Sequence, residues 1–316
     1  MKKLIMVIPC YNEQEVLPET AKRMVEKYDS LMERQLIARD SRILFVDDGS
    51  KDETWPMIEE LVEANAIFSG LKLSRNRGHQ NAVLAGLMTA KEEADCVISM
   101  DADLQDDINA IDDMLAAHEQ GADVVYGVRS SRATDTAFKR NTALAFYRLM
   151  KKLGVEVVYN HADFRLMSRR VLEHLADYKE VNLFLRGMVP LVGFPSATVE
   201  YKRAERFAGE SKYPLKKMIS FALDGITSLS IKPLRLIFSL GFVIFLISLL
   251  MLLYILISWI AGRAVPGWTS ILASIWMLGG IQLLSLGVVG EYIAKIYNEA
   301  KARPRFIIEK YIKKDA

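Results

Sequence analysis

Residues 42–65, RILFVDDGSKDETWPMIEELVEAN, contain an apolar run, a polar turn and an amphipathic segment in direct succession. The run RILFV has the length and composition of a buried strand, whereas the apolar residues of TWPMIEELVEA recur at helical spacing. Similar apolar runs, each close to a helical pattern, occur at residues 3–9, 67–74, 95–103 and 122–129. Strands that alternate with helices predict an α/β domain with a mostly parallel sheet and helices on both faces.

The composition bears on two questions: whether the protein binds nucleic acid, and whether its compartment is reducing. Of the 316 residues, 51% are hydrophobic, and the formal net charge is only +2. So small a net charge gives no indication of a nucleic-acid partner, and we predict none. The two cysteines, Cys10 and Cys96, lie far apart in apolar surroundings. We expect them to be core residues in a reducing compartment rather than disulfide or zinc ligands.

The last third of the chain contains two long apolar stretches. Residues 236–260 and 271–290 carry no charged side chain, and about 20 apolar residues are enough to cross a bilayer as a helix. A buried helical hairpin in a soluble protein is the alternative, but the first stretch is long and uniformly apolar for that role. We therefore predict two transmembrane helices, at about residues 236–260 and 270–290.

The basic residues around these stretches predict an orientation. They flank the two spans on the side of the chain termini, and only Arg263 lies in the link between the spans. The positive-inside rule then places both termini in the cytoplasm and the spans in the inner or plasma membrane. The predicted division is an α/β domain at 1–212, amphipathic juxtamembrane helices at 213–233, the transmembrane region at 234–293 and a basic tail at 294–316.

An acidic cluster, DADLQDD, follows one of the predicted strands. On an extended segment Asp101, Asp103 and Gln105 would point to the same side, because side chains alternate with a period of two. Two carboxylates and an amide oxygen are hard ligands that suit Mg²⁺ or Mn²⁺, and such an ion typically bridges to substrate phosphates. For Asp106 and Asp107 we prefer a role at the start of the next helix, whose positive end favours acidic residues.

Two other polar loops are expected beside this cluster. Residues 9–13 (PCYNE) and 47–52 (DDGSKD) also follow predicted strands. Ligands of open α/β sheets collect at the carboxyl ends of the strands. Asp47 and Asp48 have carboxylates that can accept hydrogen bonds from a base N–H or a ribose hydroxyl, although Asp is also common in turns. We expect the three loops to form one site.

Four motifs in this order, VIPCYNEQEVL, VDDGSKDET, LSRNRGHQNAVLAGL and MDADLQDD, resemble the nucleotide-sugar domain of inverting family-2 glycosyltransferases, whose fold is called GT-A. The segments NHADFRLMSRRV, LFLRGMVPLVGF and RFAGESKY, then the two apolar stretches and GEYIAKIYNEAKARP, narrow the resemblance. They look like polyisoprenyl-phosphate glycosyltransferases of the bactoprenol glucosyltransferase group, which are related to dolichyl-phosphate mannose synthase. The sequence departs from the family pattern at Arg77, where many relatives have an aromatic residue, and at Ala162, where glycine is common.

The resemblance implies a role for each matching residue. Asp101, Asp103 and Gln105 would hold the metal on the donor diphosphate. The residues implied to bind the nucleotide sugar are Pro9, Tyr11, Glu13, Asp47, Asp48, Arg75 and Asp101. Those implied to bind the acceptor phosphate are Arg129, Arg140, Arg165, Arg206, Ser211 and Lys212. The catalytic set is then Asp101, Asp103, Asp163, Arg129, Arg140 and Arg206.

Two roles stay open for Asp163, the acidic residue of DFRL. The nucleophile of the implied reaction is a phosphate oxygen, which is largely ionised at neutral pH because its second pKa is about 6. A strong base is therefore unnecessary, whereas cations matter, and arginine fits phosphate with its bidentate fork. We expect Asp163 to orient Arg165 or the acceptor, with proton abstraction as the alternative. His79 is as readily structural as functional, and we leave it outside the predicted site.

The resemblance implies a membrane enzyme that moves glucose from UDP-glucose to undecaprenyl or another polyprenyl phosphate with inversion, giving a β-linked lipid-phosphate sugar. UDP-GlcNAc, UDP-Gal and GDP-Man stay open as donors, and a homo-oligomer stays open as the assembly. A processive polysaccharide synthase would carry a Gln-x-x-Arg-Trp motif, which is not in this sequence. A non-catalytic nucleotide-sugar-binding scaffold would be expected to lose part of DAD or GESK, and both are intact.

Overall fold

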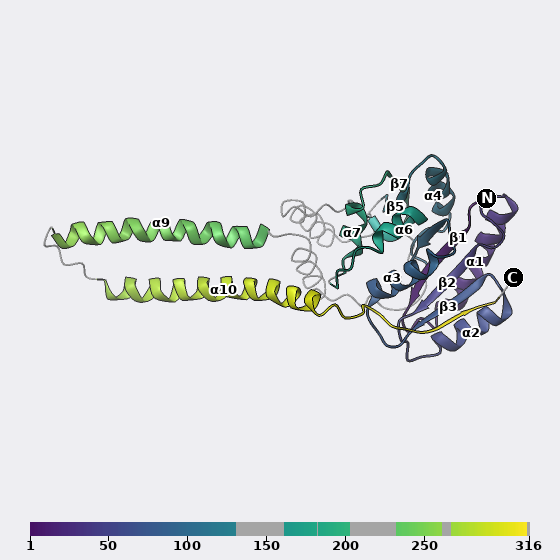
Figure 1. The fold of residues 1–316 in the computed structure, drawn as a ribbon, viewed down its shortest axis with the longest axis horizontal. Coiled ribbons are helices and arrows are strands. Elements are labelled where there is room, and N and C mark those ends of the chain that lie inside the picture. Colours follow the sequence, from purple (N-terminus) through teal and green to yellow (C-terminus); the bar gives the residue numbers. More distant parts are fainter. Residues whose placement is uncertain (131–160, 182, 203–231, 261–266, 315–316) are drawn as a thin grey trace.

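The computed structural model describes residues 1–130, 161–181, 183–202, 232–260 and 267–314. These residues form an α/β domain and two long helices that extend from it (Figure 1). The strands are Leu4–Cys10 (β1), Arg42–Asp47 (β2), Phe68–Leu73 (β3), Cys96–Ser99 (β4), Val124–Arg129 (β5), His161–Ser168 (β6), Ser196–Tyr201 (β7) and Ile308–Lys313 (β8). The helices are Leu17–Glu33 (α1), Thr54–Ala64 (α2), His79–Ala90 (α3), Ala110–Glu119 (α4), Arg169–Leu175 (α6), Leu185–Leu191 (α7), Lys232–Ile260 (α9) and Trp268–Ala300 (α10).

The described strands form one mixed, mostly parallel sheet in the order β7-β5-β6-β4-β1-β2-β3-β8. β1 pairs in parallel with β2 and β4, and β2 pairs in parallel with β3, which confirms the predicted parallel α/β core. β6 lies antiparallel between β4 and β5. This insertion, which the strand pattern did not predict, sets Arg165 opposite Ser99 and so brings the DFRL segment beside the end of β4.

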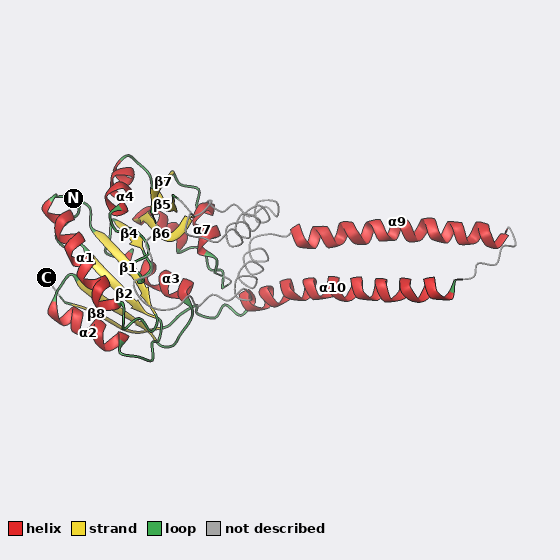
Figure 2. Ribbon diagram, turned by 180° about the vertical axis from the view of Figure 1, so that it is seen from behind, coloured by secondary structure: helices red, strands yellow, loops and turns green. Residues whose placement is uncertain are grey.

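Each face of the sheet is covered by helices, as expected (Figure 2). Leu4, Met6 and Ile8 of β1 pack in a cluster that includes buried residues of α1, α2 and α4. Ile5 and Val7 point the other way, into a cluster that includes residues of α3, α6 and α7. Both cysteines are free and buried, in agreement with their predicted place in the core.

Glycine is required where α3 crosses the sheet. A Cβ on Gly86 would lie 2.3 Å from Val7 Cγ1, which is too close for a van der Waals contact. The missing side chain lets α3 approach the strands closely. The N-terminus of α3, with His79 as its first residue, is thereby held against the carboxyl end of the sheet.

The apolar C-terminal stretches form the helices α9 and α10, which run side by side away from the sheet in both ribbon views (Figures 1 and 2). Within the described residues, Met277–Ala300 is long and apolar enough to cross a membrane, and few of its residues are buried. α10 continues beyond the predicted span to Ala300. The crossing by α9 and the membrane orientation stay predictions, and most of the predicted juxtamembrane segment (213–231) lies outside the described residues.

The predicted basic tail contains a strand that the sequence analysis missed. β8 pairs antiparallel with β3 at the edge of the sheet. Two of its lysines form ion pairs with acidic residues of the domain. Lys310 Nζ lies 2.6 Å from Glu59 Oε1, and Lys313 Nζ lies 2.6 Å from Glu93 Oε1. The chain therefore leaves the domain, forms the helical pair and returns to complete the same sheet.

Candidate active site

The loops after β1 and β2 lie against each other at the carboxyl edge of the sheet. The backbone N–H of Asn12 donates to Ser50 Oγ at 3.0 Å, and that of Glu13 donates to Thr54 Oγ1 at 2.9 Å. Asn12 Oδ1 in turn accepts from the N–H of Lys51 at 2.9 Å. These reciprocal contacts bring together two of the three loops that the sequence analysis expected to form one site.

The two carboxylates after β2 hold the backbone of this edge in place. Asp47 is buried and accepts from the N–H of Ser50 at 3.1 Å, and burial raises its pKa. Asp48 accepts from the N–H groups of Arg77 and Gly78, at 2.7 and 2.8 Å. Asp48 therefore fixes the turn that leads into α3, a contact that the predicted role in nucleotide binding did not include.

A second glycine, Gly49, permits the contact between the loop after β2 and the turn that leads into α3. Gly49 has a φ of +69°, and a Cβ there would lie 2.6 Å from the backbone nitrogen of Asn76.

The other predicted nucleotide-binding residues are placed at the same edge. Pro9 is buried in β1, Tyr11 is 37% exposed and Arg75 is exposed. The side chains of Tyr11 and Arg75 therefore lie at the surface of this edge, where a ligand can reach them.

The acidic loop after β4 is a turn, and the predicted alternation of its side chains is wrong. β4 ends at Ser99, and the loop contains Leu104 in the left-handed region with φ 55°. Asp103 Oδ1 accepts from the N–H of Gln105 at 3.2 Å, which is a local turn contact. Parity along an extended strand therefore does not relate Asp101, Asp103 and Gln105, although they lie in one short loop.

The sequence analysis expected Asp106 to act at the start of α4, and this expectation is wrong because the side chain contacts other residues. It is 4% exposed and accepts from the Tyr201 hydroxyl at 2.5 Å, with Arg129 Nη2 at 3.6 Å. Burial, followed by the charge of Asp101, raises the pKa of Asp106 to about 6. Arg129, which was predicted to bind the acceptor phosphate, thus contacts a buried carboxylate of the acidic loop.

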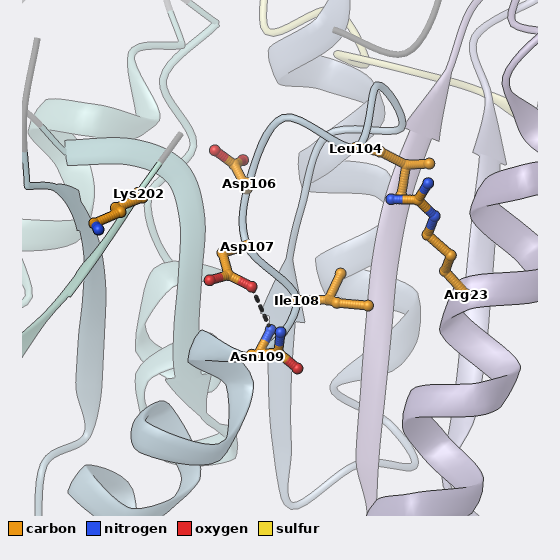
Figure 3. A pocket seen from close by; sticks show the side chains of 7 residues that line it. All are labelled: Arg23, Leu104, Asp106, Asp107, Ile108, Asn109 and Lys202. Carbon is orange, nitrogen blue, oxygen red and sulfur yellow. Dashed lines mark hydrogen bonds between the residues drawn. The ribbon is translucent and has the colours of Figure 1, made fainter. Parts of the chain in front are cut away.

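Asp107 does support the approach to α4. Its Oδ1 accepts from the N–H of Asn109 at 2.9 Å, directly before the helix begins (Figure 3). A pocket lies beside this part of the loop, and neither Asp101 nor Asp163 is among the residues that line it. The residues that line it are Arg23, Leu104, Asp106, Asp107, Ile108, Asn109 and Lys202.

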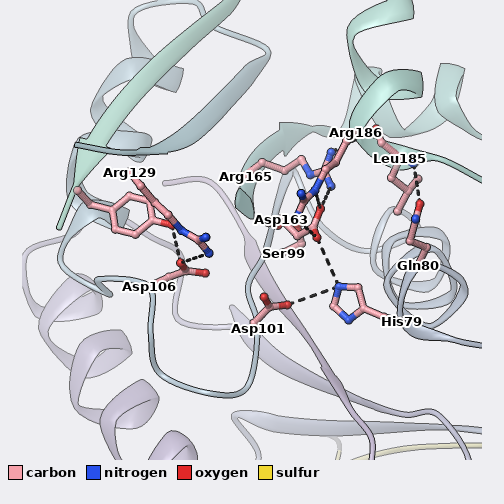
Figure 4. A network of polar contacts seen from close by, with 11 residues as sticks. His79, Gln80, Ser99, Asp101, Asp106, Arg129, Asp163, Arg165, Leu185 and Arg186 are labelled. Carbon is pink, nitrogen blue, oxygen red and sulfur yellow. Dashed lines mark hydrogen bonds and ion pairs between the residues drawn. The ribbon is translucent and has the colours of Figure 1, made fainter. Parts of the chain in front are cut away.

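Asp163 is the centre of a network of cationic side chains (Figure 4). Arg165 Nη2 donates to Oδ1 at 2.8 Å, while Arg186 approaches with Nε at 3.2 Å from Oδ1 and Nη2 at 2.9 Å from Oδ2. Burial acts to raise the pKa of Asp163, but Arg186, His79 and Arg165 hold it well below its usual range. Asp163 therefore accepts hydrogen bonds from two arginines, which hold its pKa below the ordinary range of a carboxylate.

His79 joins this network to the acidic loop. Its Nε2 lies 3.5 Å from Asp101 Oδ1 and 3.7 Å from Asp163 Oδ2 (Figure 4). Burial acts to lower the pKa of His79, but the two carboxylates outweigh it and raise the pKa to about 9. The pKa of Asp101 is raised, first by burial and then by Asp163 and Asp103, against the lowering effect of His79.

Sequence reasoning missed two of these residues and misjudged a third. His79 was set aside and Arg186 was not selected, although both lie in segments, RGHQ and FLRG, that carried the resemblance. Arg165 was predicted to bind the acceptor phosphate. Its side chain is 1% exposed and donates to Asp163 and to the carbonyl of Leu185, so we reassign it to positioning Asp163. The predicted residues Arg140, Arg206, Ser211 and Lys212 lie outside the described residues.

Comparisons with known proteins identify the family of the chain. The family model for glycosyl transferase family 2 matches residues 5–176, and the model for the GtrB C-terminal hairpin matches residues 232–296. The chain is 56% identical to the uncharacterized glycosyltransferase YkoT of Bacillus subtilis (strain 168), over 97% of this chain and 91% of that protein. It is 41% identical to the SfII prophage-derived bactoprenol glucosyl transferase of Shigella flexneri, over 98% of each chain.

One solved structure with similar coverage is the mannosyltransferase PcManGT from Pyrobaculum calidifontis in complex with GDP-Man and Mn²⁺. It covers 94% of this chain and 84% of its own, with 15% sequence identity and a TM-score of 0.46.

Proposed function

Because the chain belongs to glycosyl transferase family 2 and is a glycosyltransferase, we propose that it transfers glucose from UDP-glucose to undecaprenyl or another polyprenyl phosphate. The observation that carries this proposal is the network around Asp163, which gathers Arg165, Arg186 and His79 beside the acidic loop. A transfer between two phosphate-bearing substrates requires such a concentration of positive charge. The similarity to bactoprenol glucosyl transferases supports the choice of donor and acceptor.

The acidic loop has the chemistry of a divalent-cation site that is completed by substrate. Among the residues that the structure describes, no group of three or more His, Cys, Asp or Glu side chains is arranged to hold a metal. Burial raises the pKa of Asp101, and the negative charges of Asp163 and Asp103 add to the rise, so a bound cation would stabilise the ionised carboxylate. We propose that Asp101 and Asp103, with Gln105, hold Mg²⁺ or Mn²⁺, which would neutralise charge on the leaving diphosphate.

The reaction that we propose is a single displacement. An acceptor phosphate oxygen forms a bond to the anomeric carbon while the bond from that carbon to the nucleoside diphosphate breaks, so the anomeric centre inverts. The attacking oxygen is already ionised near neutral pH, since the second pKa of a phosphate monoester is about 6. The low pKa of Asp163 and its contacts with two arginines favour the positioning role over proton abstraction.

The helical pair α9 and α10 would bring this site to the lipid. Apolar side chains along both helices are exposed, including Leu250 and Leu283 at 67% and 72%. Because β8 belongs to the same sheet as β1, the strands that precede α9 in the sequence and the strand that follows α10 lie on one side of any membrane that the pair spans. We propose the cytoplasmic face of the inner or plasma membrane, in accord with the basic residues at that end.

The test is turnover by the purified full-length protein in detergent. UDP-glucose, undecaprenyl phosphate and Mn²⁺ are supplied, and glycolipid is measured by mass spectrometry, with UDP-GlcNAc, UDP-Gal and GDP-Man in parallel reactions. We expect product with UDP-glucose. Product with only another donor would reassign the sugar, and donor binding without product from any of the four would point to a non-catalytic scaffold.

A further inference from the structure

Arg186 adds a positive charge that Asp163 does not require for its own neutralisation. Arg165 is almost fully buried and donates to Asp163 at 2.8 Å, and one buried guanidinium compensates one carboxylate. Arg186 approaches both oxygens of the same carboxylate and remains 32% exposed. Two arginines thus contact one carboxylate, and the partly exposed Arg186 is the one that a ligand can reach.

This charge lies next to the predicted donor site. His79 contacts both Asp101 and Asp163, at 3.5 and 3.7 Å. A single imidazole ring thus separates the predicted metal ligand from the carboxylate that holds Arg186 (Figure 4). In a displacement with inversion, the attacking phosphate and the leaving diphosphate lie on opposite sides of one sugar ring. A second anion-binding group, a short distance from Asp101, fits that requirement.

The segment before Arg186 is attached to the base of the apolar helical pair. The N–H of Val181 donates to Glu299 Oε2 of α10 at 2.8 Å. Arg305, which follows α10, donates from Nη2 to the carbonyl of Tyr178 at 2.7 Å. α7, which begins one residue before Arg186, therefore lies on the side of the domain from which α10 extends (Figure 1). A lipid held beside the pair would present its headgroup on this side.

We propose, on the basis of the proposed function, that Arg186 binds the phosphate of the polyprenyl acceptor and that Asp163 positions its guanidinium for this contact. A guanidinium carries N–H donors on more than one edge, so it can contact a carboxylate on one edge and a phosphate on another. The phosphates of the donor diphosphate share this chemistry. The acceptor is favoured by the attachment of the preceding segment to α10.

The experiment compares binding of the two substrates without turnover. Full-length Arg186→Gln, Arg186→Lys and wild-type protein in detergent micelles are titrated with undecaprenyl phosphate alone, and separately with UDP and Mn²⁺. Arg170→Gln is the matched control, because Arg170 is also a partly exposed arginine paired with a carboxylate, Asp123, at 2.6 Å. Melting temperatures of all four proteins report on folding.

We expect Arg186→Gln to weaken undecaprenyl-phosphate binding about 10- to 100-fold, as for loss of a hydrogen bond to a charged group, with UDP binding little changed. Arg186→Lys should fall in between, since lysine keeps the charge but loses the fork. Arg170→Gln should bind both substrates as the wild type does.

Weaker UDP binding with unchanged lipid binding would overturn the acceptor assignment in favour of the donor diphosphate. Unchanged binding of both substrates would overturn the phosphate contact altogether and leave Arg186 a structural role. The readout is independent of turnover. If the wild type binds both substrates and forms no glycolipid, the proposed function fails while the assignment of Arg186 is still decided.

Discussion

The acidic loops after β2 and after β4 lie at the same edge of the sheet, yet their carboxylates are satisfied in different ways. After β2, Asp47 and Asp48 accept hydrogen bonds from three backbone N–H groups of the chain itself. After β4, the ion pair that the structure describes for Asp101 is with the His79 imidazole at 3.5 Å, and burial, followed by the charges of Asp163 and Asp103, raises its pKa. The first loop is complete without a ligand, whereas the second leaves negative charge for one.

This difference teaches that an Asp pair at a strand end does not by itself identify a metal site. Backbone amides that reach the carboxylate make it part of the scaffold, because they stabilise the ionised form locally. A buried carboxylate with other carboxylates nearby, such as Asp101, is instead destabilised in its ionised form, and a bound cation would stabilise it. The comparison predicts opposite responses to substitution in the two loops.

The largest effect is expected for Asp103→Ala. Loss of a proposed metal ligand should reduce the rate of glycolipid formation by about 1,000-fold, equivalent to about 4 kcal/mol. The melting temperature should stay the same or rise, because one repulsive carboxylate is gone. The matched control is Asp107→Asn, since Asp107 belongs to the same loop and contacts only the start of α4 in the described contacts. Full activity of Asp103→Ala would end the metal assignment.

Gly49→Ala should damage the loop after β2 through the fold alone. The positive φ and the 2.6 Å approach of the new Cβ to Asn76 N are expected to lower the free energy of unfolding by about 3 kcal/mol. Gly121→Ala is the control, because Gly121 has a φ of +102° and nothing within 4 Å of its Cβ position. It should lose about 1 to 2 kcal/mol in urea titrations. Equal losses in the two variants would show that Gly49 is not in tight contact with the backbone of Arg75 and Asn76.

Mn²⁺ with UDP should stabilise the wild type through the loop after β4. At 100 times the dissociation constant, binding to the native state adds about 2.7 kcal/mol, which a thermal-shift measurement detects. Asp103→Ala should show no such gain, and EDTA should remove it from the wild type. A gain of the same size in Asp103→Ala would place the cation elsewhere.

Asp48→Ala should destabilise the domain by about 2 kcal/mol, because two backbone N–H groups lose their acceptor. Asp48→Asn retains one carbonyl oxygen and should lose about half as much. Urea-induced unfolding of both variants, followed by circular dichroism, measures the difference. If neither variant is less stable than the wild type, Asp48 is not part of the scaffold, and its predicted contact with the nucleotide becomes the better account.

The parallel half of the fold could be predicted because each of its elements shows a local pattern. Residues 42–65 contain strand, turn and helix in sequence, and β1, β2 and β4 place their polar ends at one edge as parallel strands must. β6 and β8 could not be placed in this way. Their antiparallel pairing depends on which sheet edge or gap is available after the other strands have paired.

The same limit applies to the site. Asp101 and Asp103 were found because they follow a strand, which is a local signal. The contact of His79 with Asp163 joins the start of α3 to β6, and that of Arg186 joins α7 to β6. Neither pairing has a signature in the spacing of the residues. The alternation that the sequence analysis assumed for residues 101–105 failed because β4 ends at Ser99 and a turn follows.

β8 also has a consequence for the order in which the protein can be made. It occupies residues Ile308–Lys313 and follows α9 and α10 in the sequence, so the ribosome synthesises it after both long apolar helices. Until then the outer edge of β3 has no strand beside it, and unpaired edges promote pairing with other chains. The sheet is thus closed by a segment that emerges after both helices, and only a chain that has completed the helical pair can protect that edge.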